Sequence, residues 1–463
     1  MREMQNIPQD SQRRSNILVE DNDLENNDNQ ENINEDNIIN PQDINLNIQI
    51  KENSIYQNDY LFEMLQKNFL INIIILSSLI ILIILDLIYR NSLFTYSLTY
   101  EQNLQNSFSE NAIQFYKFLS NIFAYIVIFL GFIFVFCYFP LNKSILFFIA
   151  FIFGDYIEDL MKLIFSDPRP FWLNSILSQG SCEASYGNPS GHSIKAFLFS
   201  LSLCYYICML DRIKDNLKYK SIIYSIGFFG SALVAFSRIA LGVHSIDQVL
   251  FGSLIGIWIF AIFAYVFKIY DMPLSYYLKF FREKKYINYF LIILSVLLIL
   301  PIIIYLLIDI ESDYKKYGLV FGKKCSKKRN NLYYGHKNMA GSLVILLIFG
   351  IYLGQFLFWY IIKNNNYPPE DNLIIEESIN NWNNFLKEMY SSIGNITKIL
   401  GLIVIAISPL ILSKVFISGK NRLLNIFIFK KSIPYILSGF LGFGPCLYGF
   451  IYTLKEKRGS FNI

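Results

Sequence analysis

Six residues in three short stretches of the sequence have the types and spacing needed to handle a phosphate group. The stretches are KLIFSDPRP, GNPSGHS and SRIALGVHS, and the residues are Lys162, Arg169, Ser190, His192, Arg238 and His244. Cationic side chains and a serine hydroxyl can bind the oxygens of a tetrahedral dianion. Two histidines can supply a nucleophile and a proton donor. The pattern therefore predicts hydrolysis of a phosphate ester.

Helix ends are expected to bring these residues together. Lys162 ends a predicted membrane helix, and the prolines on both sides of Arg169 end the helical conformation there. The turn before His192 leads into a helix whose N-terminus favours an anion. Gly242 permits a tight bend before His244. A cation at a helix end is by itself more often an interfacial anchor, so the prediction rests on all three stretches together.

The composition places the chain in a membrane. It is 54% hydrophobic and 17% aromatic over 463 residues, and runs of about 20 apolar residues are long enough to cross a bilayer as helices. We count ten such spans, at residues 68–89, 120–140, 144–165, 193–210, 220–237, 246–268, 287–309, 339–362, 397–416 and 433–453. The expected fold class is all-α and polytopic.

The order of the spans predicts that all three stretches open on one membrane face. The opposite face carries Arg212, Lys214, Lys218, Lys220, Lys279, Arg282, Lys284 and Lys285. Positive loops favour the cytosol, so the site is expected to face a lumen or the outside. The endoplasmic reticulum or another endomembrane is the expected location. A second lysine-rich loop, with seven cations between residues 315 and 329, would then lie on the non-cytosolic face, so either a span is miscounted or the rule is broken there.

We predict three segments. Residues 1–62 form an Asn-rich disordered tail, residues 63–270 a six-helix core, and residues 271–463 about four additional membrane helices. The six cysteines contain no C-x-x-C pair, and we expect neither a metal nor a cofactor. Cys182 and Cys325 fall on the same face and could form a disulfide.

The motifs resemble those of the type 2 phosphatidic acid phosphatase and vanadium haloperoxidase superfamily. Its signature, Lys-x6-Arg-Pro, Pro-Ser-Gly-His and Ser-Arg-x5-His, is matched without a substitution. The resemblance implies that His244 attacks phosphorus and that His192 protonates the leaving group. It also implies that the phosphoryl oxygens are held by Lys162, Arg169, Ser190, Gly191 and Arg238.

One position departs from the family pattern. The family usually has an aspartate four residues after the nucleophilic histidine, whereas this chain has Gln248 there and Asp247 one residue earlier. Either residue could orient His244, and we include Asp247 among the candidate catalytic residues. A glutamine at this place, with the stretch SCEASYGNPSGHS, resembles the glucose-6-phosphatase branch.

Several functions remain open from the sequence. A lipid phosphate is the favoured substrate, because the site lies at the membrane surface, and a sugar phosphate is the alternative. A transporter or scaffold that keeps the phosphate site without turnover is a third reading. A haloperoxidase is disfavoured because those relatives are soluble. The small net charge of +4 disfavours nucleic acid as a partner, and the oligomeric state is not predicted.

Overall fold

A computed structural model describes residues 69–174, 176–177, 183, 185–308, 312, 316–317, 325, 336–366, 403 and 433–443. The described residues form helices and no strand. In chain order the helices are α3 (Phe69–Ser107), α4 (Glu110–Asn121), α5 (Ile128–Tyr138), α6 (Leu141–Phe165), α7 (Pro170–Leu173), α8 (Gly191–Cys208), α9 (Leu217–Ala240), α10 (Ile246–Ala261), α11 (Leu274–Arg282), α12 (Lys284–Leu307), α14 (His336–Ser342), α15 (Ile345–Asn366) and α19 (Ile433–Phe443). Two π-helical segments, η2 (Ile122–Val127) and η3 (Ile262–Val266), continue α4 into α5 and extend α10.

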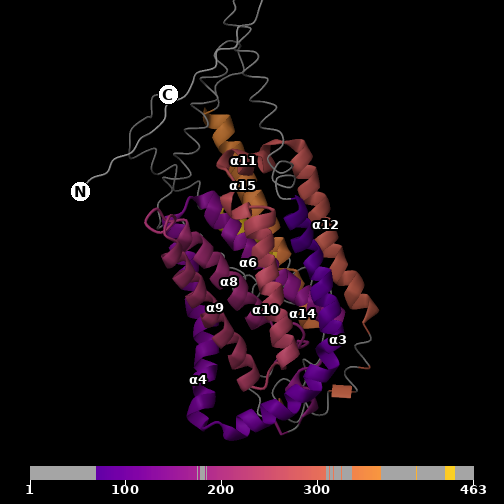
Figure 1. Ribbon diagram of the computed structural model, residues 1–463. Coiled ribbons are helices and arrows are strands. Elements are labelled where there is room, and N and C mark those ends of the chain that lie inside the picture. Colours follow the sequence, from indigo (N-terminus) through magenta and orange to yellow (C-terminus); the bar gives the residue numbers. More distant parts are fainter. Residues whose placement is uncertain are drawn as a thin grey trace, which may run out of the picture. The chain divides into compact units, whose positions relative to one another are not determined.

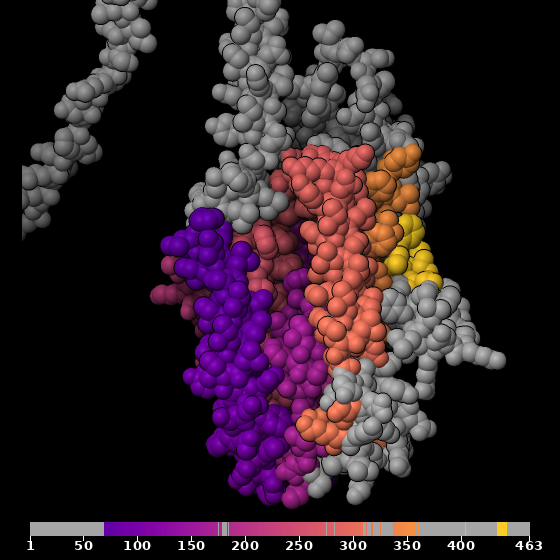
Figure 2. Space-filling view, turned by 90° about the vertical axis from the view of Figure 1, so that its right-hand side faces the viewer, coloured from indigo at the N-terminus to yellow at the C-terminus, as the bar shows by residue number. Residues whose placement is uncertain are grey.

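The predicted all-α class is confirmed for the described residues. The protein is a multi-pass integral membrane protein. Among the described residues, six helical stretches are long and apolar enough to cross a membrane: Phe69–Ser107, Glu110–Tyr138, Leu217–Ala240, Ile246–Val266, Lys284–Leu307 and Lys337–Leu357. Figure 2 shows the face formed by α3 and α12. Both helices expose many large apolar side chains, such as Ile80 and Leu307, as a lipid-facing surface requires.

Several predicted spans differ from the helices. The first apolar run, 68–89, continues as helix to Ser107, and the helix of the second begins at Glu110. The predicted eighth span consists of two helices, α14 and α15. The predicted ninth span, 397–416, lies outside the described residues except Ile403, and so does the tenth beyond Phe443. The predicted tail, 1–62, also lies outside them.

Four helices hold the site between them. In Figure 1, α6, α8, α9 and α10 run side by side, with α4 beside α9 and α3 beside α10. Helix α10 approaches α8 through glycines at one-turn spacing. A Cβ atom at Gly252 would lie 2.6 Å from the carbonyl oxygen of Ser190, and one at Gly256 would lie 2.6 Å from that of Ile194. Small residues at this spacing let membrane helices pack closely.

Local interactions fix the helix ends near the site. Ser245 caps α10, and its side chain forms a capping box with Gln248. Gly242, in the turn between α9 and α10, has a positive φ of 62°, which confirms the bend expected there. Lys162 lies in the last turn of α6, as predicted.

The helices after the core pack on it and on one another. Helix α14 lies against α6, and α15 packs against both α6 and α19. Gly341 of α14 faces the carboxylate of Asp159 so closely that a Cβ atom would collide with it. Residues Leu61–Ile463 form one compact unit. The predicted boundary near residue 270 stays a prediction.

Candidate active site

One polar cavity of about 490 Å³ collects most of the predicted site residues. Of the eight, six line it: Lys162, Arg169, Gly191, His192, Arg238 and His244. They come from the end of α6, the loop before α7, the start of α8, the end of α9 and the loop before α10. The three stretches therefore meet at one cavity, and its position on one membrane face stays a prediction.

Arg169 is the most tightly held cation of the cavity. Its Nε donates to the carbonyl oxygen of Ser185 at 2.7 Å, and Nη2 donates to the hydroxyl of Ser185 at 2.8 Å. Nη1 lies 3.0 Å from Nε2 of His244 and 3.2 Å from the carbonyl oxygen of Val243. The side chain is 3% exposed. Its guanidinium therefore joins two of the three motifs before any ligand is considered.

Gln248 contacts His244, whereas Asp247 lies elsewhere. Oε1 of Gln248 is 3.2 Å from Nδ1 of His244, and Nε2 donates to the carbonyl oxygen of Pro168 at 2.8 Å. Asp247 lines a separate, apolar cavity of about 220 Å³ together with Asp86 of α3. If Nδ1 carries the proton, the lone pair of Nε2 faces Arg169 and the cavity.

Two further cations belong to the same cavity. Arg238 is buried, and its Nη1 donates to the hydroxyl of Ser120 on α4 at 2.7 Å. Lys162 is also buried and pairs with Glu158, whose other oxygen is 3.2 Å from Nζ of Lys195. Glu158 thus lies between two lysines and beside the start of α8.

Ser190 and Gly191 form the start of α8. Ser190 is the N-cap, and its hydroxyl accepts a hydrogen bond from Ser193 at 3.0 Å. It is fully buried and does not line the cavity. Gly191 does line the cavity, and a Cβ atom there would collide with the Glu158 carboxylate. The Glu158 carboxylate therefore lies against the N-terminus of α8, a position that favours an anion.

Burial sets the ionisation of the loop residues. Burial lowers the pKa of His244 well below its usual value, and the neighbouring Arg169 and Arg238 add to the effect. Burial lowers the pKa of Arg169 to about 10. Burial also raises the pKa of Asp167, against the influence of its ion pair with Arg90 at 2.9 Å. At neutral pH His244 is therefore an uncharged imidazole.

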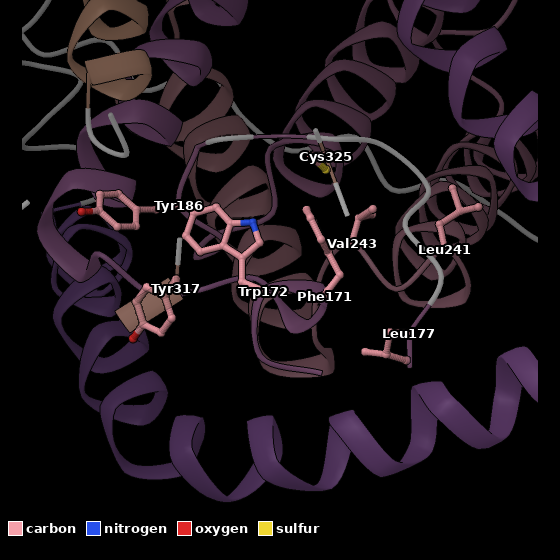
Figure 3. Close-up of a cluster of buried hydrophobic side chains, with 8 residues drawn as sticks. All are labelled: Phe171, Trp172, Leu177, Tyr186, Leu241, Val243, Tyr317 and Cys325. Atoms are coloured by element: carbon pink, nitrogen blue, oxygen red, sulfur yellow. The ribbon is translucent and has the colours of Figure 1, made fainter. Parts of the chain in front are cut away.

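Packed aromatic residues support the loop that follows Arg169. Figure 3 shows Trp172 between Phe171 and Tyr186, with Tyr317 on another side of the indole. Ring centroids of Trp172 lie 6.4 Å from Tyr186 and 6.0 Å from Tyr317. Cys325 belongs to the same buried cluster and is disulfide-bonded. Cys182 lies outside the described residues, so its predicted pairing with Cys325 stays a prediction.

The motifs did not reveal several residues that line the cavity. These are Lys117, Ser120 and Asn121 from α4, Lys195 from α8, Lys337, Ala340 and Gly341 from α14, and Tyr435 from α19. Lysines in apolar segments are a weak signal, because they are usually interfacial anchors. Helix α14 carries no motif. Among the described residues, no group of three or more histidine, cysteine or acidic side chains could hold a metal ion.

Comparison with known proteins agrees with this geometry. A family model described as the PAP2 superfamily matches residues 143–271, the stretch that contains all three motifs. Residues 143–271 are thus similar to the PAP2 superfamily. The resemblance to type 2 phosphatidic acid phosphatases is thereby confirmed. The match omits α3 and α4 and everything after residue 271, including α14.

Two PAP2 relatives can be named. Dolichyldiphosphatase 1 of Dictyostelium discoideum is 30% identical over 137 residues, which are 28% of this chain and 57% of that protein. Lipid phosphate phosphatase delta of Arabidopsis thaliana is 28% identical over 159 residues, which are 32% of this chain and 35% of that protein. The similarity thus covers less than two thirds of either relative. No solved structure matches the chain.

Proposed function

We propose that this protein is a phosphoric ester hydrolase that cleaves a phosphate monoester or diphosphate of a lipid through a phosphohistidine intermediate. One observation carries the proposal: His244 lies in a cavity with three buried cations, and Gln248 and Arg169 contact its two ring nitrogens. The names of the two relatives, a diphosphatase and a lipid phosphate phosphatase, support the same class.

In the first step, Nε2 of neutral His244 attacks phosphorus and the bond to the ester oxygen breaks. His192 donates a proton to that oxygen, and the alcohol leaves. The negative charge of the bound phosphate favours the protonated form of His192. Arg169 turns from Nε2 to a phosphoryl oxygen, and Lys162 and Arg238 neutralise the others as the transition state forms.

In the second step, water attacks the phosphohistidine. His192, now neutral, accepts a proton from that water while the bond between phosphorus and Nε2 breaks. Inorganic phosphate leaves, and both histidines return to their starting states. The three cations provide the charge neutralisation that a metal ion provides in other phosphatases, so we expect turnover to continue in a chelator.

A lipid is the favoured substrate because the cavity is built among membrane helices. Its residues come from α4, α6, α8, α9 and α14. A phosphate head group would reach this depth while its apolar chains remain in the bilayer. We place the cavity on the lumenal or external face and the protein in an endomembrane such as the endoplasmic reticulum. The positive loop at residues 212–220 supports that orientation.

The test is phosphate release by purified protein in a chelator, with wild type beside His244→Ala. The substrates are phosphatidic acid, sphingosine-1-phosphate, a polyprenyl diphosphate and glucose-6-phosphate. We expect wild type to prefer a lipid and the variant to lose at least about a thousandfold in kcat. Acid-labile, base-stable phosphate on wild-type protein after quenching would identify the phosphohistidine.

Two outcomes would contradict the proposal. Preference for glucose-6-phosphate would favour the sugar-phosphate alternative, which the Gln248 contact to His244 also fits. A folded wild type that binds inorganic phosphate but hydrolyses none of the four would favour a transporter or scaffold.

A further inference from the structure

Helix α14 lies outside the PAP2 match but contacts the loop that holds Arg169. Its residue Asn338 is fully buried. Oδ1 of Asn338 accepts a hydrogen bond from the backbone N–H of Tyr186 at 3.2 Å. Nδ2 donates to Oδ1 of Asp159 on α6 at 2.7 Å. One side chain thus ties α14 both to the loop and to α6, whose last turn contains Lys162.

The loop contact leads directly to the cavity. Tyr186 follows Ser185, whose carbonyl and hydroxyl oxygens accept hydrogen bonds from Arg169. Arg169 in turn lies 3.0 Å from Nε2 of His244. Asn338 is therefore connected to His244, the expected nucleophile, in three steps. Asn338 bonds to the backbone of Tyr186, the neighbouring Ser185 bonds to Arg169, and Arg169 contacts His244. A shift of the loop would move the guanidinium with it.

Other contacts from the same part of the chain hold this loop. Lys337, the neighbour of Asn338, pairs with Glu183, which precedes the loop. Tyr317 packs on Trp172, which itself contacts Tyr186 (Figure 3). Segments after residue 308 thus hold the loop by a hydrogen bond, an ion pair and ring contacts. The PAP2 region alone does not supply these restraints.

We propose that Asn338 is a positioning residue that sets the place of Arg169, so that α14 is part of the catalytic apparatus. This inference rests on the proposed function for its kinetic consequence, but its effect on anion binding is independent of turnover. Misplacing a substrate-holding group by about 1 Å can cost roughly a hundredfold in rate. We therefore expect Asn338→Ala to lower kcat by roughly 10- to 100-fold.

An exchange of groups gives a sharper test. Asn338→Asp keeps an acceptor for the N–H of Tyr186 but turns a second carboxylate toward Asp159, so activity should fall as in Asn338→Ala. Adding Asp159→Asn restores a donor opposite the new acceptor. We expect the double variant to recover most of the activity that Asn338→Asp loses. Simple loss of packing would not be rescued in this way.

A matched control lies on the same helix. Ser342 is also buried and polar, but its hydroxyl donates only to the carbonyl oxygen of Met339 within α14. Ser342→Ala should therefore lower the unfolding temperature no more than Asn338→Ala does, and it should leave kcat per folded protein unchanged. All comparisons should use full-length protein in the same detergent.

Binding of orthovanadate and inorganic phosphate, measured by calorimetry, separates this inference from the proposed function. Asn338→Ala should weaken both by roughly tenfold or more, because the cation that holds the oxygens is displaced. If wild type binds phosphate but hydrolyses nothing, the proposed function fails and the binding comparison still tests Asn338. Unchanged affinity and kcat per folded Asn338→Ala protein, or no rescue by the double variant, would overturn the inference.

Discussion

Gln248 contacts His244 at the place where the family usually has a carboxylate. An amide oxygen near Nδ1 can fix the tautomer of the ring, as a carboxylate would, but it adds no negative charge that favours imidazolium. Burial and two nearby arginines already lower the pKa of His244. The glutamine therefore does not oppose the lowered pKa of His244, and the imidazole stays uncharged at neutral pH.

Replacing the amide by an acid should therefore change the pH profile. Gln248→Glu would place a negative charge about 3 Å from Nδ1 and raise the pKa of His244. The acid side of the kcat/KM profile should move to higher pH by a similar amount. Asp247→Asn is the control, because Asp247 lines another cavity, and its profile should match wild type.

The wild-type profile follows from the same shift. Because the pKa of His244 is lowered, the ring stays neutral as the pH falls through 6.5 and gains a proton only at more acid pH. The second pKa of a phosphate monoester is about 6, so the substrate should titrate first. We expect the fall in kcat/KM on the acid side to have its midpoint at about pH 6 or below. A loss centred near 6.5 or above, unaltered with a more acidic substrate, would contradict this assignment.

At the scale of elements, the contact between α10 and α8 holds the start of α8 in place. Ser190, the N-cap of α8, donates its N–H to the carbonyl oxygen of Gln248 at 2.9 Å. Gly252 lies against the same residue. The turn that presents Gly191 and His192 to the cavity is therefore fixed by the first two turns of α10.

A single methyl group at this contact should be costly. Gly252→Ala would force the backbones apart, destabilise the protein by about 1–3 kcal/mol and lower kcat by displacing the start of α8. Gly230→Ala is the matched control, because a Cβ atom at Gly230 of α9 meets nothing within 4 Å. In thermal unfolding and phosphate release, Gly252→Ala should be less stable and less active than Gly230→Ala. Equal behaviour would mean that this contact does not hold the site.

The sequence predicted that most of the described helices exist, but it predicted the residues at which they begin and end less well. Hydropathy ends the first span near residue 89, yet α3 continues through a polar segment to Ser107. That segment is held by tertiary contacts, because Ser97, fully buried, accepts a hydrogen bond from the N–H of Ile246 at 2.8 Å. Helix α4 begins early because the hydroxyl of Ser109 caps it. Neither effect appears in a count of apolar residues.

At the scale of the whole molecule, the motif residues were predictable and the opposite wall of the cavity was not. Phosphate binding needs particular side chains at fixed spacing, so Lys162, Arg169 and His244 stand out in the sequence. Asn338 and Gly341 instead pack against Asp159, which lies more than 150 residues earlier in the sequence. An asparagine and a glycine carry no signal until the contact with Asp159 is known.

The disulfide of Cys325 gives a test at this scale. Cys325 lies in the cluster with Trp172 and Tyr186, so removing its bond should loosen the loop that holds Arg169. Cys325→Ser should destabilise the protein by about 2–4 kcal/mol, measured as unfolding with and without reductant. If the predicted partner is right, Cys182→Ser will free one thiol at Cys325. Equal mobility and thiol counts with and without reductant would exclude the bond in the purified protein.

The cavity wall made by α14 and Tyr435 has a consequence for how such proteins diversify. The groups expected to break the ester bond come from residues 162–244, whereas Lys337, Ala340, Gly341 and Tyr435 come from far along the chain. Substitutions in the second set can reshape the space around the leaving group without touching the first. Two proteins with identical motifs can therefore catalyse the same reaction on different substrates. Comparison of their motifs alone would not distinguish them.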